Sequence, residues 1–129
     1  MTTQAVARIL EHKRQTCGTE HYYLWSPLFR TVVATDGAKL VADEANTYWL
    51  LDAIASWIPE AEVAGESFQV WTLNHGPDDS VILVCDDGNE RELVRQDIAY
   101  SDFPRELLPF KLFVQEGGPG WVIMLPEEY

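Results

Sequence analysis

The stretch "NTYWLLDAIASWIP", residues 46–59, decides how this chain folds, because it is almost continuously apolar yet carries one carboxylate, Asp52. Its apolar residues surround a helical axis instead of forming one stripe, which predicts a helix buried on most sides that ends before Pro59. A buried carboxylate needs a partner, a hydrogen bond or a proton. We therefore expect Asp52 to be an internally satisfied anchor. The alternatives are a pocket acid for proton transfer, or exposure to solvent through a gap in the packing.

Composition narrows the class of protein. The 129 residues carry 21 acidic and nine basic side chains, a formal net charge of −12, and the length indicates one domain spanning 1–129. Too few bases are present to neutralise nucleic-acid phosphates or to hold an anionic membrane surface. The charge is compatible with a basic protein partner. The N-terminus resembles no secretory leader, and two cysteines form no disulfide framework, so we expect a cytoplasmic protein.

The flanking segments read as strands joined by tight turns. "TDG" at 35–37 can cap the helical region 37–58, which we expect to kink or break at Asn46. Beyond Pro59, alternation predicts strands in "SFQVWTLN", "SVILVCD" and "RELVRQDIAY", and a further hairpin in "FKLFVQ…WVIML". Short turns favour antiparallel neighbours. The predicted fold class is α+β, with two layers: a twisted antiparallel sheet of about five to six strands under a long helix.

Two groups of residues are candidates for function. The first is a helix–sheet pocket formed by Asp52, Tyr48 and Arg95, the place for a small enzyme or ligand-binding site. The second is a partner surface at Trp71 and Leu73, which fall on the opposite face of their strand from Phe68 and Val70. If Trp71 and Leu73 point outward, they form an apolar patch.

A metal centre is a weaker hypothesis. His12, Cys17 and His21 are residue types that bind zinc, and Cys85 could supply a fourth ligand. The spacing is not that of a standard finger, so we expect no metal and no cofactor. A Cys–His pair at Cys17 remains an alternative, although an acidic protein offers few settings that activate a thiol.

The segments "TDGAKLVADEANTYWLLDAIASW", "FQVWTL", "IAYSDFP" and "LPEEY" resemble a family of small uncharacterised bacterial and mobile-element proteins, defined as a domain of unknown function. The resemblance covers residues from about 20 to the C-terminus and is strongest at "TDG", "YWLLDAIAS" and "YSDFP". It implies no activity, cofactor or catalytic residue, so every functional hypothesis here is based on physical argument.

These observations favour a non-catalytic protein-binding or accessory module, either a monomer or a homodimer. A sharper version has its acidic surface imitate nucleic acid and occupy a basic site on another protein. The alternative, from a different class, is a small enzyme or ligand-binding domain with the pocket around Asp52.

Overall fold

The computed structural model describes residues 4, 6–10, 22–26, 29–117 and 120–129. Its seven strands are β1 (Tyr22–Ser26), β2 (Phe29–Thr35), β3 (Phe68–His75), β4 (Val81–Asp86), β5 (Glu92–Ile98), β6 (Phe110–Gly117) and β7 (Gly120–Met124). The helices are α2 (Asp36–Ala45), α3 (Tyr48–Trp57) and the short α4 (Ala61–Ala64), with 3-10 turns η1 (Arg105–Leu107) and η2 (Pro126–Glu128). Residues 6–10 add a helical segment before β1.

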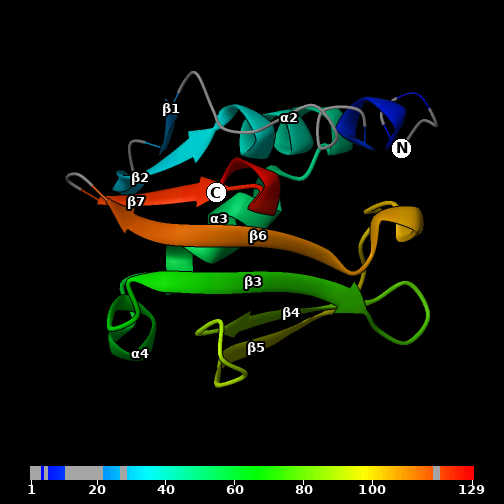
Figure 1. Cartoon of the computed structure of the whole chain (residues 1–129). Coiled ribbons are helices and arrows are strands. Elements are labelled where there is room, and N and C mark those ends of the chain that lie inside the picture. Colours follow the sequence, from blue (N-terminus) through cyan, green and yellow to red (C-terminus); the bar gives the residue numbers. More distant parts are fainter. Residues whose placement is uncertain (1–3, 5, 11–21, 27–28, 118–119) are drawn as a thin grey trace.

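The strands form one mixed sheet in the order β1-β2-β7-β6-β3-β4-β5 (Figure 1). Neighbouring strands are antiparallel except β2 and β7, which are parallel, with Val33 opposite Val122. The prediction of an antiparallel sheet of five to six strands is therefore wrong. The local hairpins β3–β4, β4–β5 and β6–β7 follow the predicted turns, and β1 and β2 form a fourth local antiparallel pair. The β2–β7 pairing joins segments from opposite ends of the sequence. Parallel strands are not connected by a tight turn, so no turn residues in the sequence predict this pairing.

The prediction of one long helix is also wrong, because the region 36–57 forms two helices of ten residues each. The break lies at Asn46, where the expected kink or break falls. Asn46 adopts the left-handed conformation with φ 53°, and its N–H donates to the Ala42 carbonyl. Asparagine tolerates this conformation better than most residues, so it ends α2 and lets α3 start in a new direction.

The N-terminus of α2 is held by the C-terminal segment. The Thr35 hydroxyl caps α2 by accepting a bond from Ala38 N at 3.3 Å, as "TDG" predicted. The buried Glu128 carboxylate accepts from Thr35 Oγ1 at 2.6 Å, Gly37 N at 2.9 Å and Leu125 N at 2.8 Å. A Cβ on Gly37 would lie 2.5 Å from Glu128 Oε1, so only glycine permits this close approach. The "TDG" and "LPEEY" segments therefore form one clasp.

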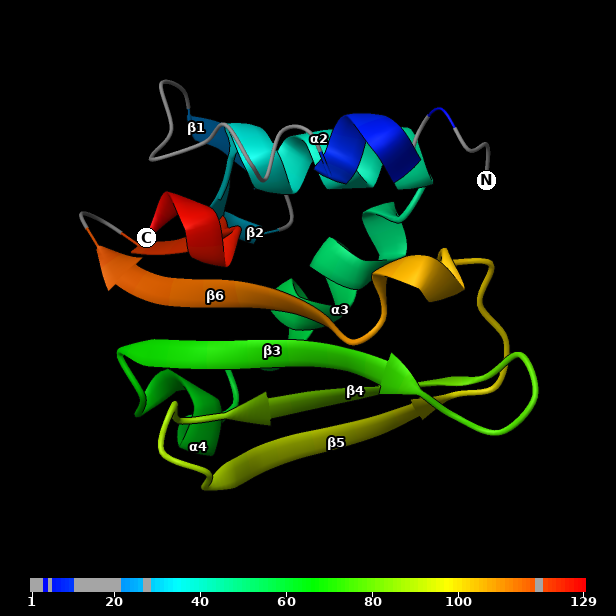
Figure 2. The same cartoon turned by 45° about the vertical axis from the view of Figure 1, so that its right-hand side comes forward.

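The main core lies between one face of the sheet and the helices. Both α2 and α3 contact β2, and α2 also contacts β7. The buried side chains of β4 and β6 alternate along each strand and face this layer. The opposite face carries a cluster of Phe68, Phe113 and Tyr129, whose ring centroids lie 5.0 to 5.9 Å apart. Figures 1 and 2 show β5 at the free lower edge and α3 behind β6 and β3.

None of the helices in the described part of the chain is both long and apolar enough to cross a membrane.

Candidate functional site

Asp52 does not lie in the core. Its side chain is exposed on α3, and so are Tyr48 and Ser56, one turn before and one turn after it. The opposite face of α3 is buried through Leu50, Leu51, Ile54 and Ala55. The prediction of a helix buried on most sides, with Asp52 as an internal anchor, is wrong. The stripe at positions 48, 52 and 56 faces solvent, so the acid costs no burial energy.

The predicted pocket of Asp52, Tyr48 and Arg95 is not formed. The Tyr48 hydroxyl donates to Asp43 at 2.5 Å, and this bond to a carboxylate raises the pKa of Tyr48. Arg95 is exposed and pairs with Glu92 at 2.9 Å. In the β4–β5 register Arg95 lies opposite Val84 while Gln96 lies opposite the buried Leu83, so Arg95 points away from α3.

Trp71 and Leu73 are each 1% exposed and belong to the core, so the predicted partner surface does not exist. The Trp71 indole donates to Gln69 Oε1 at 3.0 Å, and the Gln69 amide donates to the Val63 carbonyl at 2.8 Å. These bonds satisfy the polar atoms of both side chains within the core. The expected alternation holds, but the face turned away from the helices belongs to Phe68 and Val70.

The metal hypothesis rests on His12, Cys17 and His21, all of which lie outside the described residues. Within the described part of the chain, no group of three or more histidine, cysteine, aspartate or glutamate side chains could hold a metal ion.

An open groove does exist between helix and sheet, one residue away from the predicted positions. It has a volume of about 470 Å³ and lies between α3 and the end of β5. Its lining comprises Trp49, Ala53, Gln96, Ile98, Tyr100, Ser101 and Asp102. We call it the α3–β5 groove. The walls are mostly apolar, and Gln96 is fixed in place by accepting a bond from the Trp57 indole at 2.8 Å. Such a mixture of apolar walls and few polar groups is typical of binding clefts.

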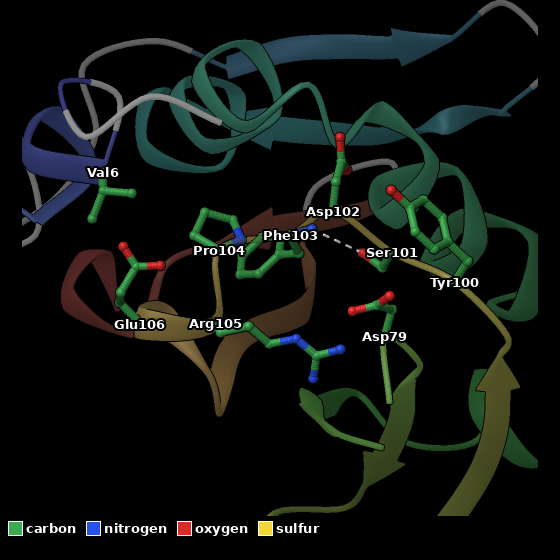
Figure 3. A pocket seen from close by; sticks show the side chains of 9 residues that line it. All are labelled: Val6, Asp79, Tyr100, Ser101, Asp102, Phe103, Pro104, Arg105 and Glu106. Carbon is green, nitrogen blue, oxygen red and sulfur yellow. Dashed lines mark hydrogen bonds between the residues drawn. The ribbon is translucent and has the colours of Figure 1, made fainter. Parts of the chain in front are cut away.

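A second hollow continues from this groove across residues 100–102. It has a volume of about 310 Å³, and its lining includes the carboxylates Asp79, Asp102 and Glu106 (Figure 3). We call it the acidic hollow. Its backbone is fixed, because Ser101 N donates to the Asp79 carbonyl at 2.9 Å and Ser101 Oγ accepts from Phe103 N at 3.1 Å.

Among the described residues that line the acidic hollow, one is a base, Arg105. Figure 3 shows its guanidinium reaching towards the turn that carries Asp79. Arg105 Nη2 donates to the Asp78 carbonyl at 2.7 Å, and Nη1 lies 3.2 Å from His75 Nδ1. The described lining carries three carboxylates around one engaged guanidinium and is therefore net negative, which favours cationic over anionic groups.

A third hollow lies at the other end of β5. It has a volume of about 270 Å³, and its lining includes Trp57, Glu60 and Glu62 together with Leu93 and Val94. We call it the α4 hollow. Trp57 lines the α4 hollow and Gln96 lines the α3–β5 groove. The hydrogen bond between these two side chains therefore lies between the two cavities.

Cys85 is inert in the folded protein. Its side chain is buried on β4, and burial, with smaller effects from the charges of Asp86 and Asp87, raises the pKa of the thiol to about 12. A thiol nucleophile needs a lowered pKa and access to solvent. Cys85 has neither, so it supports packing and no covalent chemistry.

This pKa predicts a stability change at high pH. An unfolded thiol loses its proton above about pH 9 while the folded thiol keeps it, so raising the pH favours unfolding until the folded pKa is passed. Between pH 8 and pH 10, the wild-type protein should lose about 1 kcal/mol more unfolding free energy than Cys85→Val. Urea unfolding of both proteins measures this difference, and parallel pH curves would contradict it.

The residues that line the groove are thus the sequence neighbours of the predicted ones: Trp49, Ala53 and Gln96 in place of Tyr48, Asp52 and Arg95. The alternation signal was available, since Gln96 and Ile98 share a strand face with the buried Val94. The segment "IAYSDFP", which carried part of the resemblance, links the groove to the acidic hollow. The composition of this segment does not indicate a cleft. The segment is held in place by the hydrogen bond from Ser101 N to the Asp79 carbonyl in the 76–79 turn, which is distant in sequence.

Comparison with known proteins agrees with the resemblance noted in the sequence. A model of a family described as "Family of unknown function (DUF6876)" matches residues 7–129. The chain belongs to this family. A similar solved structure is described as a protein of unknown function from Enterococcus faecalis. It is 17% identical, covers 84% of this chain and 98% of its own, and superposes with a TM-score of 0.55. That likeness concerns the fold alone. A comparison with curated proteins finds no significant match.

Proposed function

We propose that this protein is a non-catalytic binding module that holds a segment of another protein in the α3–β5 groove. The observation that carries the proposal is the groove itself, which is open, apolar-walled and built on rigid elements. Trp49 and Ala53 come from a helix, and Gln96 and Ile98 come from a strand. Aromatic residues at the centre of a cleft are common anchors for protein partners.

The polar side chains near the groove support binding over catalysis. Gln96 is engaged with Trp57, and Ser101 accepts a main-chain bond. Outside the groove lining, the hydroxyls of Ser56 and Ser80 donate to the carbonyls of Ala53 and Pro77. A nucleophile in an enzyme is instead expected beside a base that takes its proton. The three serines bond to the local backbone and Gln96 bonds to the Trp57 side chain. The groove offers a partner shape, apolar contact and charge.

Selection of binding peptides tests this function. A random peptide library is displayed on phage and selected against the wild-type chain, and selected peptides are resynthesised and titrated calorimetrically. We expect one-to-one binding in the micromolar range with a negative heat-capacity change, because apolar surface is buried. A selection that enriches no peptide above the background of an unrelated acidic protein would contradict the proposal.

A further inference from the structure

The edge of the sheet next to the groove is unoccupied by the other described strands. β5 is the last strand in the sheet order and pairs only with β4 among them. An edge strand presents a row of backbone N–H and C=O groups that a further strand can pair with. An extended segment of a partner protein can therefore add to the sheet beside β5.

The α4 hollow and the α3–β5 groove follow this edge in chain order. The acidic hollow lies beyond the C-terminal end of β5, and its lining continues to η1, which Figure 2 shows next to β6 and away from β5. The α4 hollow borders Leu93 and Val94, the α3–β5 groove borders Gln96 and Ile98, and the acidic hollow begins at Tyr100. Strands rise about 3.3 Å per residue, so the seven residues of β5 span roughly 23 Å. Alternate side chains of an added strand would point towards the helical layer, where these hollows lie.

The charges along the edge define the occupant. Glu60 and Glu62 lie at one end, and Asp102 and Asp79 lie at the other, with the apolar surface of Trp49, Ala53 and Ile98 between them. β5 itself adds no net positive charge, because its base Arg95 pairs with Glu92 and Asp97 is a further acid. A second copy of this chain is disfavoured, because two chains of net charge −12 repel each other. Lysine or arginine side chains match both ends, and an aliphatic side chain matches the centre.

We infer that the partner segment is an extended basic peptide, with lysine or arginine on both sides of an aliphatic centre, that adds as a strand to β5. This inference rests on the proposed function and specifies its ligand. The apolar centre fills the α3–β5 groove, the basic side chains reach the α4 hollow and the acidic hollow, and main-chain bonds to β5 hold the direction of the segment.

Three synthetic peptides of about nine residues test the inference, a length that covers β5 with one residue to spare at each end. The first is acetyl-KTKVLVKTK-amide. The second replaces every lysine with glutamate. The third keeps all side chains of the first but carries N-methyl groups on its three central residues, which removes their N–H donors and blocks strand pairing. Affinities are measured by titration, and hydrogen exchange reports protection of the backbone amides of Glu92–Ile98.

We expect the first peptide to bind at least tenfold more tightly than either of the others and to slow exchange along β5. Its affinity should fall as salt screens the charges, and Asp102→Lys should weaken it about tenfold, while Glu116→Lys, an exposed site on β6, should not. Equal binding of the lysine and glutamate peptides would overturn the basic partner, and equal binding of the N-methylated peptide would overturn strand addition. If the phage-selected peptides occupy the groove but the lysine peptide does not bind, this inference fails and the proposed function stands.

Discussion

Replacing Glu128 with alanine is expected to lower the free energy of unfolding by about 3 kcal/mol. Glu128 is 9% exposed, and its carboxylate accepts hydrogen bonds from Thr35 Oγ1, Gly37 N and Leu125 N. Alanine leaves these donors without their acceptor and opens a space beside the start of α2. The clasp joins the C-terminal segment to the β2–α2 junction, so its loss weakens the attachment of the C-terminal segment and the start of α2. Urea unfolding followed by tryptophan fluorescence measures the effect.

Two further variants distinguish the stability that the clasp contributes from the effect of removing any one acidic charge. Glu128→Gln keeps the shape and one carbonyl acceptor, so its effect should lie between wild type and alanine. Glu116→Gln removes an acid from an exposed position on β6 and should change stability by less than about 0.5 kcal/mol. If Glu128→Ala and Glu116→Gln have the same small effect, the clasp does not stabilise the fold.

Replacing Ala53 with tryptophan is expected to weaken binding of a groove-selected peptide at least about a hundredfold, or roughly 2.7 kcal/mol. Ala53 is half-buried on the wall of the α3–β5 groove, so an added indole projects into the space that the peptide needs. The substitution costs only about 0.5 kcal/mol in helix propensity, so the fold should survive. Titration with the peptide and a thermal melt measure both effects.

Ser56→Trp is the matched control for this variant. It places the same side chain on the same helix, but at an exposed position outside the groove lining. Binding should remain within about twofold of wild type, because the indole at position 56 points to solvent. Equal loss of binding in both variants would mean that the groove does not hold the peptide.

Local chemistry in the sequence predicts much of this fold. Tight turns rich in Gly, Asp and Asn give the β3–β4–β5 and β6–β7 hairpins, Thr35 caps α2, and Asn46 breaks the helical region. The parallel pairing of β2 with β7 is different, because it depends on long-range packing that no nearby residue encodes. The number of strands and the mixed sheet therefore could not be predicted from turns.

The pocket expected from the sequence lies one residue away from the α3–β5 groove, on the wrong faces of the same helix and strand. Asp52 was predicted to be buried because most residues around it are apolar. The exposed stripe at four-residue spacing, formed by Tyr48, Asp52 and Ser56, is therefore not evident from the composition of the helix. The next residue along, Trp49, lines the groove, and Gln96 does so instead of Arg95. In helices and strands a shift of one residue changes the face, so a correct region with an incorrect face gives the wrong side chains. Burial of the neighbours decides the face, and burial depends on the whole fold.

Mapping a groove-selected peptide onto ¹⁵N-labelled protein tests the central claim most directly. If the α3–β5 groove is the docking site, amide shifts on titration should concentrate at Ala53, Gln96, Ile98 and Tyr100, and saturate with one peptide per chain. Shifts centred instead on Phe68, Phe113 and Tyr129, on the opposite face of the sheet, would contradict the claim and move the binding surface there.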